Sequence, residues 1–179
     1  LAHREGRLAE AEKGYLEVLR KKPDWGPVLN ALGTVFLDKS QPDKAKKIFE
    51  KACELRPPYF PACYNLARLK QRENDHKGAI SIYRAILERQ PDFGQAWNNL
   101  GMAYREIGDQ DEALSCFRRA VASAPDMAEA WNNLGVAQDE FNMIENASES
   151  YRKSIELRSD YASAHFNLGI SLQKLRRYK

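Results

Sequence analysis

Residues 94–127 read GQAWNNLGMAYREIGDQDEALSCFRRAVASAPDM, and the pattern of this stretch returns every 34 residues along the chain. A proline keeps the period, and so do an alanine and a small residue at two other places. These three sets are Pro23, Pro57, Pro91 and Pro125; Ala11, Ala45, Ala79, Ala113 and Ala147; and Gly33, Ala67, Gly101, Gly135 and Gly169. A fixed period of this length indicates a protein built from stacked copies of one structural unit.

One copy of the repeat predicts two helices. Trp97, Leu100 and Tyr104 lie at i, i+3 and i+7, which places them on one face of a helix. Gly108 then ends this helix, because glycine accepts the left-handed backbone conformation. A second apolar stripe follows, and Pro125 ends it because proline lacks an N–H and clashes with the preceding turn.

The residues that recur most regularly match a known repeat pattern, W-x2-L-G-x2-Y…A-x3-F…P. They are Trp97, Leu100, Gly101, Tyr104, Ala113, Phe117, Ala120 and Pro125. The whole chain therefore resembles the tetratricopeptide repeat family. The resemblance implies an all-α fold, a right-handed superhelix (an α-solenoid) of antiparallel helix pairs.

The period divides the chain into a single predicted array. Full repeats are expected at 26–59, 60–93, 94–127 and 128–161. Residues 1–25 would hold the second helix of a truncated repeat, and residues 162–179 the first helix of another. Because both ends fall inside a repeat, we expect a fragment of a longer protein. Its exposed terminal helices could pair with a second copy and form a homo-oligomer.

Several positions depart from the pattern. Lys70 and Gln138 replace the aromatic residue of the first helix, and Ser159 replaces the proline. Prolines crowd the junction at 57–61, which predicts a stiffer or differently angled connection. Aspartate follows the proline in most junctions, so we expect Asp126 to cap the next helix with its side-chain oxygen.

By resemblance, the first helices line a concave groove that holds an extended peptide. A row of asparagines there can pair with a peptide main chain, because each amide carries two N–H donors and an acceptor oxygen. The row is similar to the ladder in the repeat domain of O-linked N-acetylglucosamine transferase. Alternatively, these asparagines bond to a neighbouring helix and support the repeat. The predicted peptide-binding residues are Asn65, Asn99, Asn133 and Asn167, with Asn98, Asn132, Tyr64, Arg68, Arg72, Arg105, Asp139 and Glu140.

The charges of this groove change sign along the chain. Arg68 and Arg72 stand in one repeat, and Asp139 and Glu140 stand two repeats later. A ligand with an acidic segment followed by a basic one would match this order; the alternative is a solvated surface of mixed charge. The carboxylate clamp of chaperone-binding repeat domains is not expected, because the corresponding positions lack its lysines.

The composition limits the classes of function. The net charge is +3 with acids and bases interspersed, which argues against a nucleic-acid partner, and no apolar run is long enough for membrane insertion. Cys53, Cys63 and Cys116 are expected to be reduced, packed thiols, which with the lack of a signal peptide predicts a cytoplasmic protein. No catalytic residue, cofactor or metal site is expected, because the histidines share no face with cysteines or paired acids.

These observations predict a scaffold for protein–protein interaction that binds a peptide or partner segment in the concave groove. Two alternatives stay open. The chain can be the substrate-recruiting arm of a larger enzyme such as a glycosyltransferase, or a self-assembling module.

Overall fold

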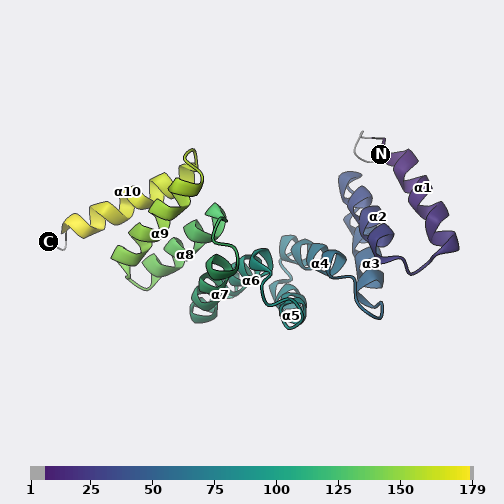
Figure 1. Ribbon diagram of the computed structural model, residues 1–179, viewed down its shortest axis with the longest axis horizontal. Coiled ribbons are helices and arrows are strands. Elements are labelled where there is room, and N and C mark those ends of the chain that lie inside the picture. The colour runs from purple at the N-terminus through teal and green to yellow at the C-terminus, as the bar shows by residue number, and fades with distance from the viewer. Residues whose placement is uncertain (1–6, 178–179) are drawn as a thin grey trace. The chain divides into compact units, whose positions relative to one another are not determined.

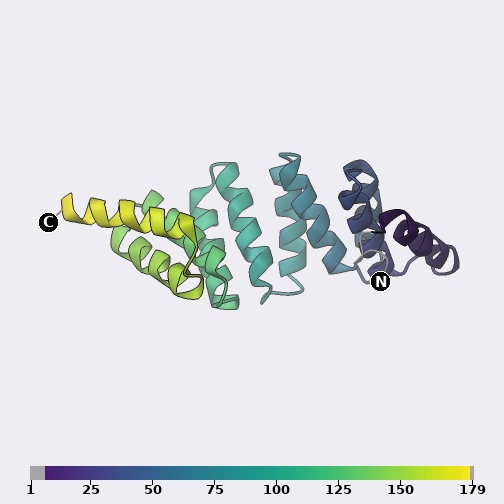
Figure 2. The same ribbon diagram turned by 90° about the horizontal axis from the view of Figure 1, so that it is seen from above.

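The computed structural model describes residues 7–177, and these fold into ten α-helices without a strand (Figures 1 and 2). Helix contacts divide the chain into two compact units, named here unit 1 (up to Ile82) and unit 2 (from Tyr83). The boundary falls inside α5. The helices are α1 (Leu8–Lys21), α2 (Gly26–Asp38), α3 (Pro42–Cys53), α4 (Phe60–Arg72), α5 (His76–Leu87), α6 (Gly94–Glu106), α7 (Gln110–Ser123), α8 (Ala128–Glu140), α9 (Ile144–Leu157) and α10 (Ala162–Arg177).

Unit 1 holds α1 to α4 and the first part of α5. Consecutive helices pack against each other, α1 on α2, α2 on α3 and α3 on α4, and α2 also contacts α4. Small alanines let these helices approach closely, while leucines and two phenylalanines fill the space between them. The core consists of Leu29, Leu32, Phe36, Ala45, Phe49, Ala52, Ala62, Leu66 and Leu69.

Unit 2 repeats this arrangement. In both views of the molecule, α6 lies beside α7 and α8 beside α9 (Figures 1 and 2). Each second helix also packs on the next first helix, α7 on α8 and α9 on α10, and the first helices α6, α8 and α10 contact one another in order. Consecutive packed helix pairs without strands among the described residues confirm the predicted α-solenoid.

The period-keeping glycines of the first helices allow the closest helix contacts. A methyl group added to Gly101 would lie 2.8 Å from the ring of Phe117, and one added to Gly135 would lie 2.5 Å from the ring of Tyr151. Real side chains do not approach so closely, so a larger residue would push the two helices of the repeat apart. Gly169 on α10 is different, because nothing lies within 4 Å of the same position.

The turns between the two helices of a repeat also keep the period. One residue in each turn has a positive φ: Ser40 at 56°, Asn74 at 62°, Gly108 at 82° and Asn142 at 57°. The left-handed turn predicted at Gly108 is therefore present. Asparagine tolerates this conformation better than most residues, which explains its use in place of glycine.

The predicted aspartate cap is wrong. Helix α8 has Met127 as its N-cap residue and receives no side-chain cap bond. Asp126 therefore stands one residue outside the position from which a side chain reaches the free N–H groups of the first turn. A cap does occur on the other helix of the repeat, where Asp109 accepts a 3.3 Å hydrogen bond from the N–H of Glu112 at the start of α7.

The cysteines differ from the expectation of three reduced thiols. Cys53 at the end of α3 and Cys63 in the first turns of α4 form a disulfide, with their Cα atoms 5.3 Å apart. The intervening residues, which include the crowded prolines, return the chain so that the two helix ends meet. Cys116 is a free, buried thiol, and burial raises its pKa to about 12. No helix of the described chain is long and apolar enough to cross a membrane.

Candidate peptide-binding site

The asparagines of the first helices bond to one another. In each pair, Nδ2 of one asparagine donates to Oδ1 of an asparagine one helix pair earlier. The pairs are Asn65 with Asn30 at 2.9 Å, Asn133 with Asn98 at 2.9 Å, and Asn167 with Asn132 at 3.2 Å. These bonds join neighbouring first helices, as the supporting role proposed for the row requires.

The asparagines of these first helices differ in how far they are buried. The side chain of Asn98 is 0 % exposed, and Asn132 and Asn133 are also buried. A peptide on the surface would not reach these three amides without displacing their neighbours. Asn65 and Asn167 are only half-buried, as is Asn99, and their amides lie nearer to the surface.

Unit 1 carries a groove between α2 and α4 with a volume of about 240 Å³. Arg68 and Arg72 lie one helical turn apart on α4 and both line it, and the guanidinium of Arg68 lies 5.8 Å from the ring centre of Tyr64. The hydroxyl of Thr34 donates to the carbonyl of Asn30 at 3.0 Å, so that its methyl group is held in place. The groove, named here the inner groove, is lined by Thr34, Leu37, Asp38, Asn65, Arg68, Leu69 and Arg72.

The acidic part of the predicted site lies in unit 2 and is largely engaged. The side chain of Asp139 is 15 % exposed and accepts hydrogen bonds from the hydroxyls of Tyr151 at 3.0 Å and Ser171 at 2.8 Å, and from Nζ of Lys174 at 3.3 Å. Burial, and then the charge of Asp139, raise the pKa of Tyr151 well above its usual value. Glu140 is exposed and Arg105 half-buried.

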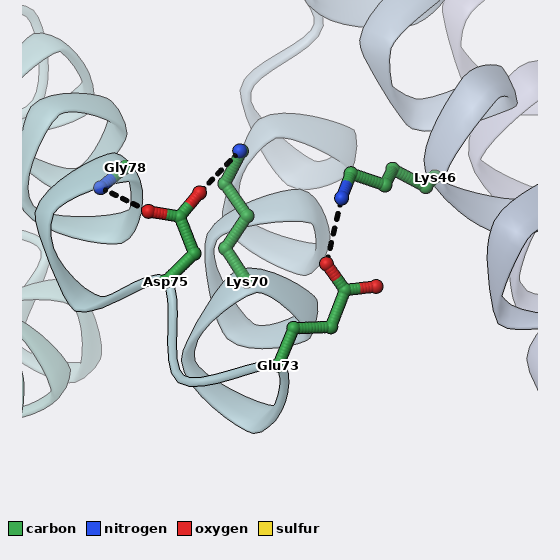
Figure 3. A network of polar contacts seen from close by, with 5 residues as sticks. All are labelled: Lys46, Lys70, Glu73, Asp75 and Gly78. Atoms are coloured by element: carbon green, nitrogen blue, oxygen red, sulfur yellow. Dashed lines mark hydrogen bonds and ion pairs between the residues drawn. The ribbon is translucent and has the colours of Figure 1, made fainter.

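The departures from the repeat pattern are explained by local polar bonds. Lys70 donates to a carboxylate oxygen of Asp75 at 2.7 Å, and the other oxygen accepts from the N–H of Gly78 at 2.9 Å (Figure 3). The hydrogen bond from Lys70 lowers the pKa of Asp75. Beside them, Lys46 pairs with Glu73 at 2.6 Å and so ties α3 to the end of α4 (Figure 3).

The polar side chain of Gln138 finds its hydrogen-bond partner on a different helix. It is buried, and its Oε1 accepts a 2.7 Å hydrogen bond from the hydroxyl of Ser150 on α9. The repeat therefore exchanges an apolar contact between its two helices for a hydrogen bond.

A ring nitrogen near the start of three first helices bonds to the junction before it. In each case the acceptor is a carbonyl six residues earlier. The pairs are Trp97 Nε1 with Pro91 at 2.7 Å, Trp131 Nε1 with Pro125 at 2.9 Å, and His165 Nε2 with Ser159 at 2.8 Å. This contact fixes the angle at which the chain enters the helix.

The described residues include no group of three or more histidine, cysteine or acidic side chains arranged to hold a metal ion. Of the predicted site residues, the structure gathers Asn65, Arg68 and Arg72 in one groove. Leu69 of the inner groove was not predicted. Its position on α4, one helical turn after Asn65, is the signal that could have found it.

Comparison with solved structures supports the fold. The crystal structure of MamA superposes with a TM-score of 0.78 at 21% identity, covering 90% of this chain and 94% of that one. The structure of MamA 41-end from Desulfovibrio magneticus RS-1 gives 0.77 at 22% identity, covering 90% and 91%. YrrB, described as a TPR protein with an unusual peptide-binding site, gives 0.75 at 25% identity, covering 93% and 86%.

No curated protein matches the sequence. Family models described as "Tetratricopeptide repeat" match residues 26–59 and, in two overlapping stretches, residues 62–126 and 92–160. These stretches cover most of the chain and coincide with the helix pairs described above. The chain therefore belongs to the tetratricopeptide repeat family, whose stacked helix pairs support a role as a scaffold for protein interaction.

Proposed function

We propose that the chain binds an extended, acidic peptide segment of a partner protein in the inner groove of unit 1. The observation that carries the proposal is the convergence of Arg68, Arg72 and Asn65 on one groove between two first helices. The description of the similar protein YrrB as peptide-binding agrees with a ligand of this class.

The chemistry of the lining fits such a segment. Arginine presents a planar fork of donors that matches a carboxylate, and two forks one turn apart can take two acidic side chains. Stacking near Tyr64 limits the conformations of the Arg68 side chain, which reduces the entropy lost on binding. Leu37, which is half-buried, supplies apolar contact for the rest of the segment.

Asn65 would hold the main chain of the peptide. One of its N–H groups donates to Asn30, and an amide has a second N–H and an acceptor oxygen for a peptide unit. Asn99, Asn167, Arg105 and Glu140 are proposed as further contacts. The buried Asn98, Asn132 and Asn133 would support the helices that carry these contacts, and Asp139 would bind a basic residue only if Lys174 moved away.

The test uses a capped peptide of alternating glutamate and alanine, with a glutamine version as the reference. We expect the double variant Arg68→Gln, Arg72→Gln to bind the acidic peptide about tenfold more weakly in fluorescence anisotropy, and added salt to weaken wild-type binding. Arg152→Gln, an exposed arginine on α9, is the matched control and should bind like the wild type. Equal affinities for the wild type and the double variant would contradict the proposal.

The same groove would serve a chain that recruits substrates for a larger enzyme, without catalytic residues of its own. A cytoplasmic location and the absence of a nucleic-acid partner also belong to this proposal. The Cys53–Cys63 disulfide argues against a cytoplasmic location, because such bonds persist mainly in oxidising compartments.

Self-association through α10 is a second candidate. Phe166 is 70 % exposed on this helix, and Ile170 and Leu172 are exposed as well. A second copy of the chain that covered them would remove this apolar surface from water. Sedimentation over a wide concentration series, with Phe166→Glu as the control, tests it. A wild type that sediments as a monomer throughout would rule self-association out.

A further inference from the structure

We propose a second binding site in unit 2, a groove between α5 and α7 that binds an extended segment of a partner protein through its main chain. This groove, named here the outer groove, has a volume of about 480 Å³, which is within the range of known ligand sites. Its floor is formed by Trp97, Leu100 and Tyr104 of α6. Its charged walls are Arg84 and Glu88 on one side and Glu112 and Arg119 on the other.

The floor is apolar and fixed in position. The indole of Trp97 is held by its 2.7 Å bond to the carbonyl of Pro91. Tyr104 is 5 % exposed, and its hydroxyl has no hydrogen-bond partner among residues 7–177. Leu100 and Tyr104 are almost fully buried, so the half-buried indole of Trp97 is the part of the floor that an apolar side chain can contact.

One arginine covers each end of the floor. The guanidinium of Arg84 lies 5.5 Å from the ring centre of Tyr104, and that of Arg119 lies 4.7 Å from the ring centre of Trp97. Trp97 and Tyr104 are separated by two helical turns, or about 10 Å. The two guanidinium groups therefore come from opposite walls and stand at opposite ends of the groove.

Each arginine has a glutamate on the other wall. Glu112 stands at the Tyr104 end: burial raises the pKa of Tyr104, and the negative charge of Glu112 adds to that effect. Glu88 lies one turn beyond Arg84, toward Pro91, and so stands at the Trp97 end with Arg119. None of these four charged side chains makes an ion pair with another residue in the described part of the chain.

Such an arrangement fits a peptide unit better than a charged ligand. Each end offers an N–H donor from an arginine and an acceptor from a glutamate, which are the partners that the C=O and N–H of one peptide unit need. The four charges sum to zero, so a strongly acidic or basic segment gains little. Two such ends about 10 Å apart match roughly three residues of extended chain.

The neighbouring repeats explain why the groove occurs here. The place of Tyr104 is taken by Lys70 in the preceding repeat and by Gln138 in the following one. Lys70 bonds to Asp75, and Gln138 bonds to Ser150. Each side chain is engaged in its own repeat, so only the repeat of α6 combines two aromatic rings in its floor.

The test uses five capped pentapeptides, acetyl-Gly-Ser-X-Ser-Gly-amide, in which X is Leu, Ile, Met, Phe or Tyr. Binding to the full chain is followed through the indole N–H signals in ¹H–¹⁵N NMR spectra. We expect at least one peptide to shift the signal of Trp97 in a saturable manner. Trp131 is the internal control, because it makes the same bond to a proline carbonyl outside the groove.

Two comparisons identify the mode of binding. A peptide N-methylated at X and at the following serine lacks the main-chain donors and should bind at least fivefold more weakly. The double variant Glu88→Ala, Arg119→Ala, which removes the acceptor and the donor at one end of the groove, should weaken the unmodified peptide to a similar degree. The Arg68→Gln, Arg72→Gln protein should bind it normally, so failure of the inner groove and failure of the outer groove are distinguishable.

Three results would overturn the proposal. They are the absence of a saturable shift with all five peptides, equal binding of the N-methylated peptide, and unchanged binding by the Glu88→Ala, Arg119→Ala variant. Circular dichroism of that variant checks its fold. If the double variant is unfolded, Arg119→Met replaces it, because methionine keeps an unbranched side chain over Trp97 but has no N–H donor, and unchanged binding by this variant would equally overturn the proposal.

Discussion

The side-chain amide of Asn133 donates a 2.9 Å hydrogen bond to Oδ1 of Asn98, and both residues are buried between first helices of unit 2. Buried amides are costly when unpaired, so each residue depends on the other. The bond therefore links one repeat to the next. Apolar side chains at the same place would not fix the relative orientation of the two repeats, because their contacts are not directional.

The first prediction concerns this pair. Replacing Asn98 with Ala leaves the amide of Asn133 without its acceptor, and we expect unfolding in urea to require about 1–3 kcal/mol less free energy. Asn167→Ala is the control, because that residue is half-buried and water can replace its partner. The Asn167→Ala change should lower the free energy of unfolding by less than about 1 kcal/mol. Equal stability of the wild type and Asn98→Ala would contradict the supporting role of the bond.

The second prediction compares two glycines of the same column. Gly101→Ala places a methyl group against the ring of Phe117 and should destabilise the protein by about 1–3 kcal/mol. Gly169→Ala meets open space within a helix and should stabilise it by roughly 0.5–1 kcal/mol. Thermal unfolding of both variants is the measurement. The same sign of effect for the two would show that packing does not govern this column.

The third prediction compares two buried serines of α9. The hydroxyl of Ser148 has no partner among the described residues, whereas that of Ser154 donates to the carbonyl of Ala128 at 2.7 Å. We expect Ser148→Ala to raise the free energy of unfolding by about 1 kcal/mol and Ser154→Ala to lower it by a similar amount. Chemical denaturation followed by circular dichroism distinguishes these outcomes. A loss of stability in Ser148→Ala would mean that its hydroxyl does bond.

The fourth prediction concerns acid. The pKa of Asp75 is lower in the folded chain than in the unfolded chain, chiefly because Lys70 donates to its carboxylate. The stabilisation is therefore complete above the unfolded value of about 3.9 and is lost as the pH falls through the lower folded value. Half of the Asp75 side chain is solvated, so we expect less than about 1 kcal/mol.

The measurement is a urea titration at several pH values on the wild type and Asp75→Asn. The difference in stability should be constant above about pH 5 and shrink below about pH 4. Lys70→Gln in both backgrounds closes a double-mutant cycle that isolates the pair. A difference that does not change with pH would show that the carboxylate is not the source of the effect.

The fifth prediction is a count of thiols. The chain has three cysteines, two of them joined in a disulfide. Ellman's reagent should therefore find one thiol in the denatured chain without reductant and three after reduction. In the native protein the remaining thiol should react slowly, because Cys116 is buried and its pKa is raised to about 12. Three fast thiols in the unreduced, denatured chain would show that Cys53 and Cys63 are not joined.

The scaffold could be predicted because it depends on periodic residues. The spacing of Trp97, Leu100 and Tyr104 specifies a helix face, and the glycine at 101 specifies a close contact; both follow from sterics that act within one repeat. Contacts that depend on two repeats were harder to predict. Whether Asn98 or Asn99 turns toward the adjacent helix depends on the angle between helices, and sequence spacing does not contain this angle.

The polar exceptions were located but not explained by the sequence. Lys70 and Gln138 were recognised as departures, yet their partners, Asp75 and Ser150, stand in positions that differ between repeats. The disulfide was missed for a similar reason. Cys53 and Cys63 are separated by a turn whose path the repeat pattern does not describe.

The bond between His165 and the carbonyl of Ser159 has a consequence for recognising degenerate repeats. Since a carbonyl only accepts, Nε2 of the imidazole must carry the proton in this contact. Both residues differ from the tryptophan and proline that make this contact in the repeats of α6 and α8, yet the contact is the same. A search profile that scored this column for a ring N–H, rather than for aromatic bulk, would retain divergent copies that hydrophobicity alone discards.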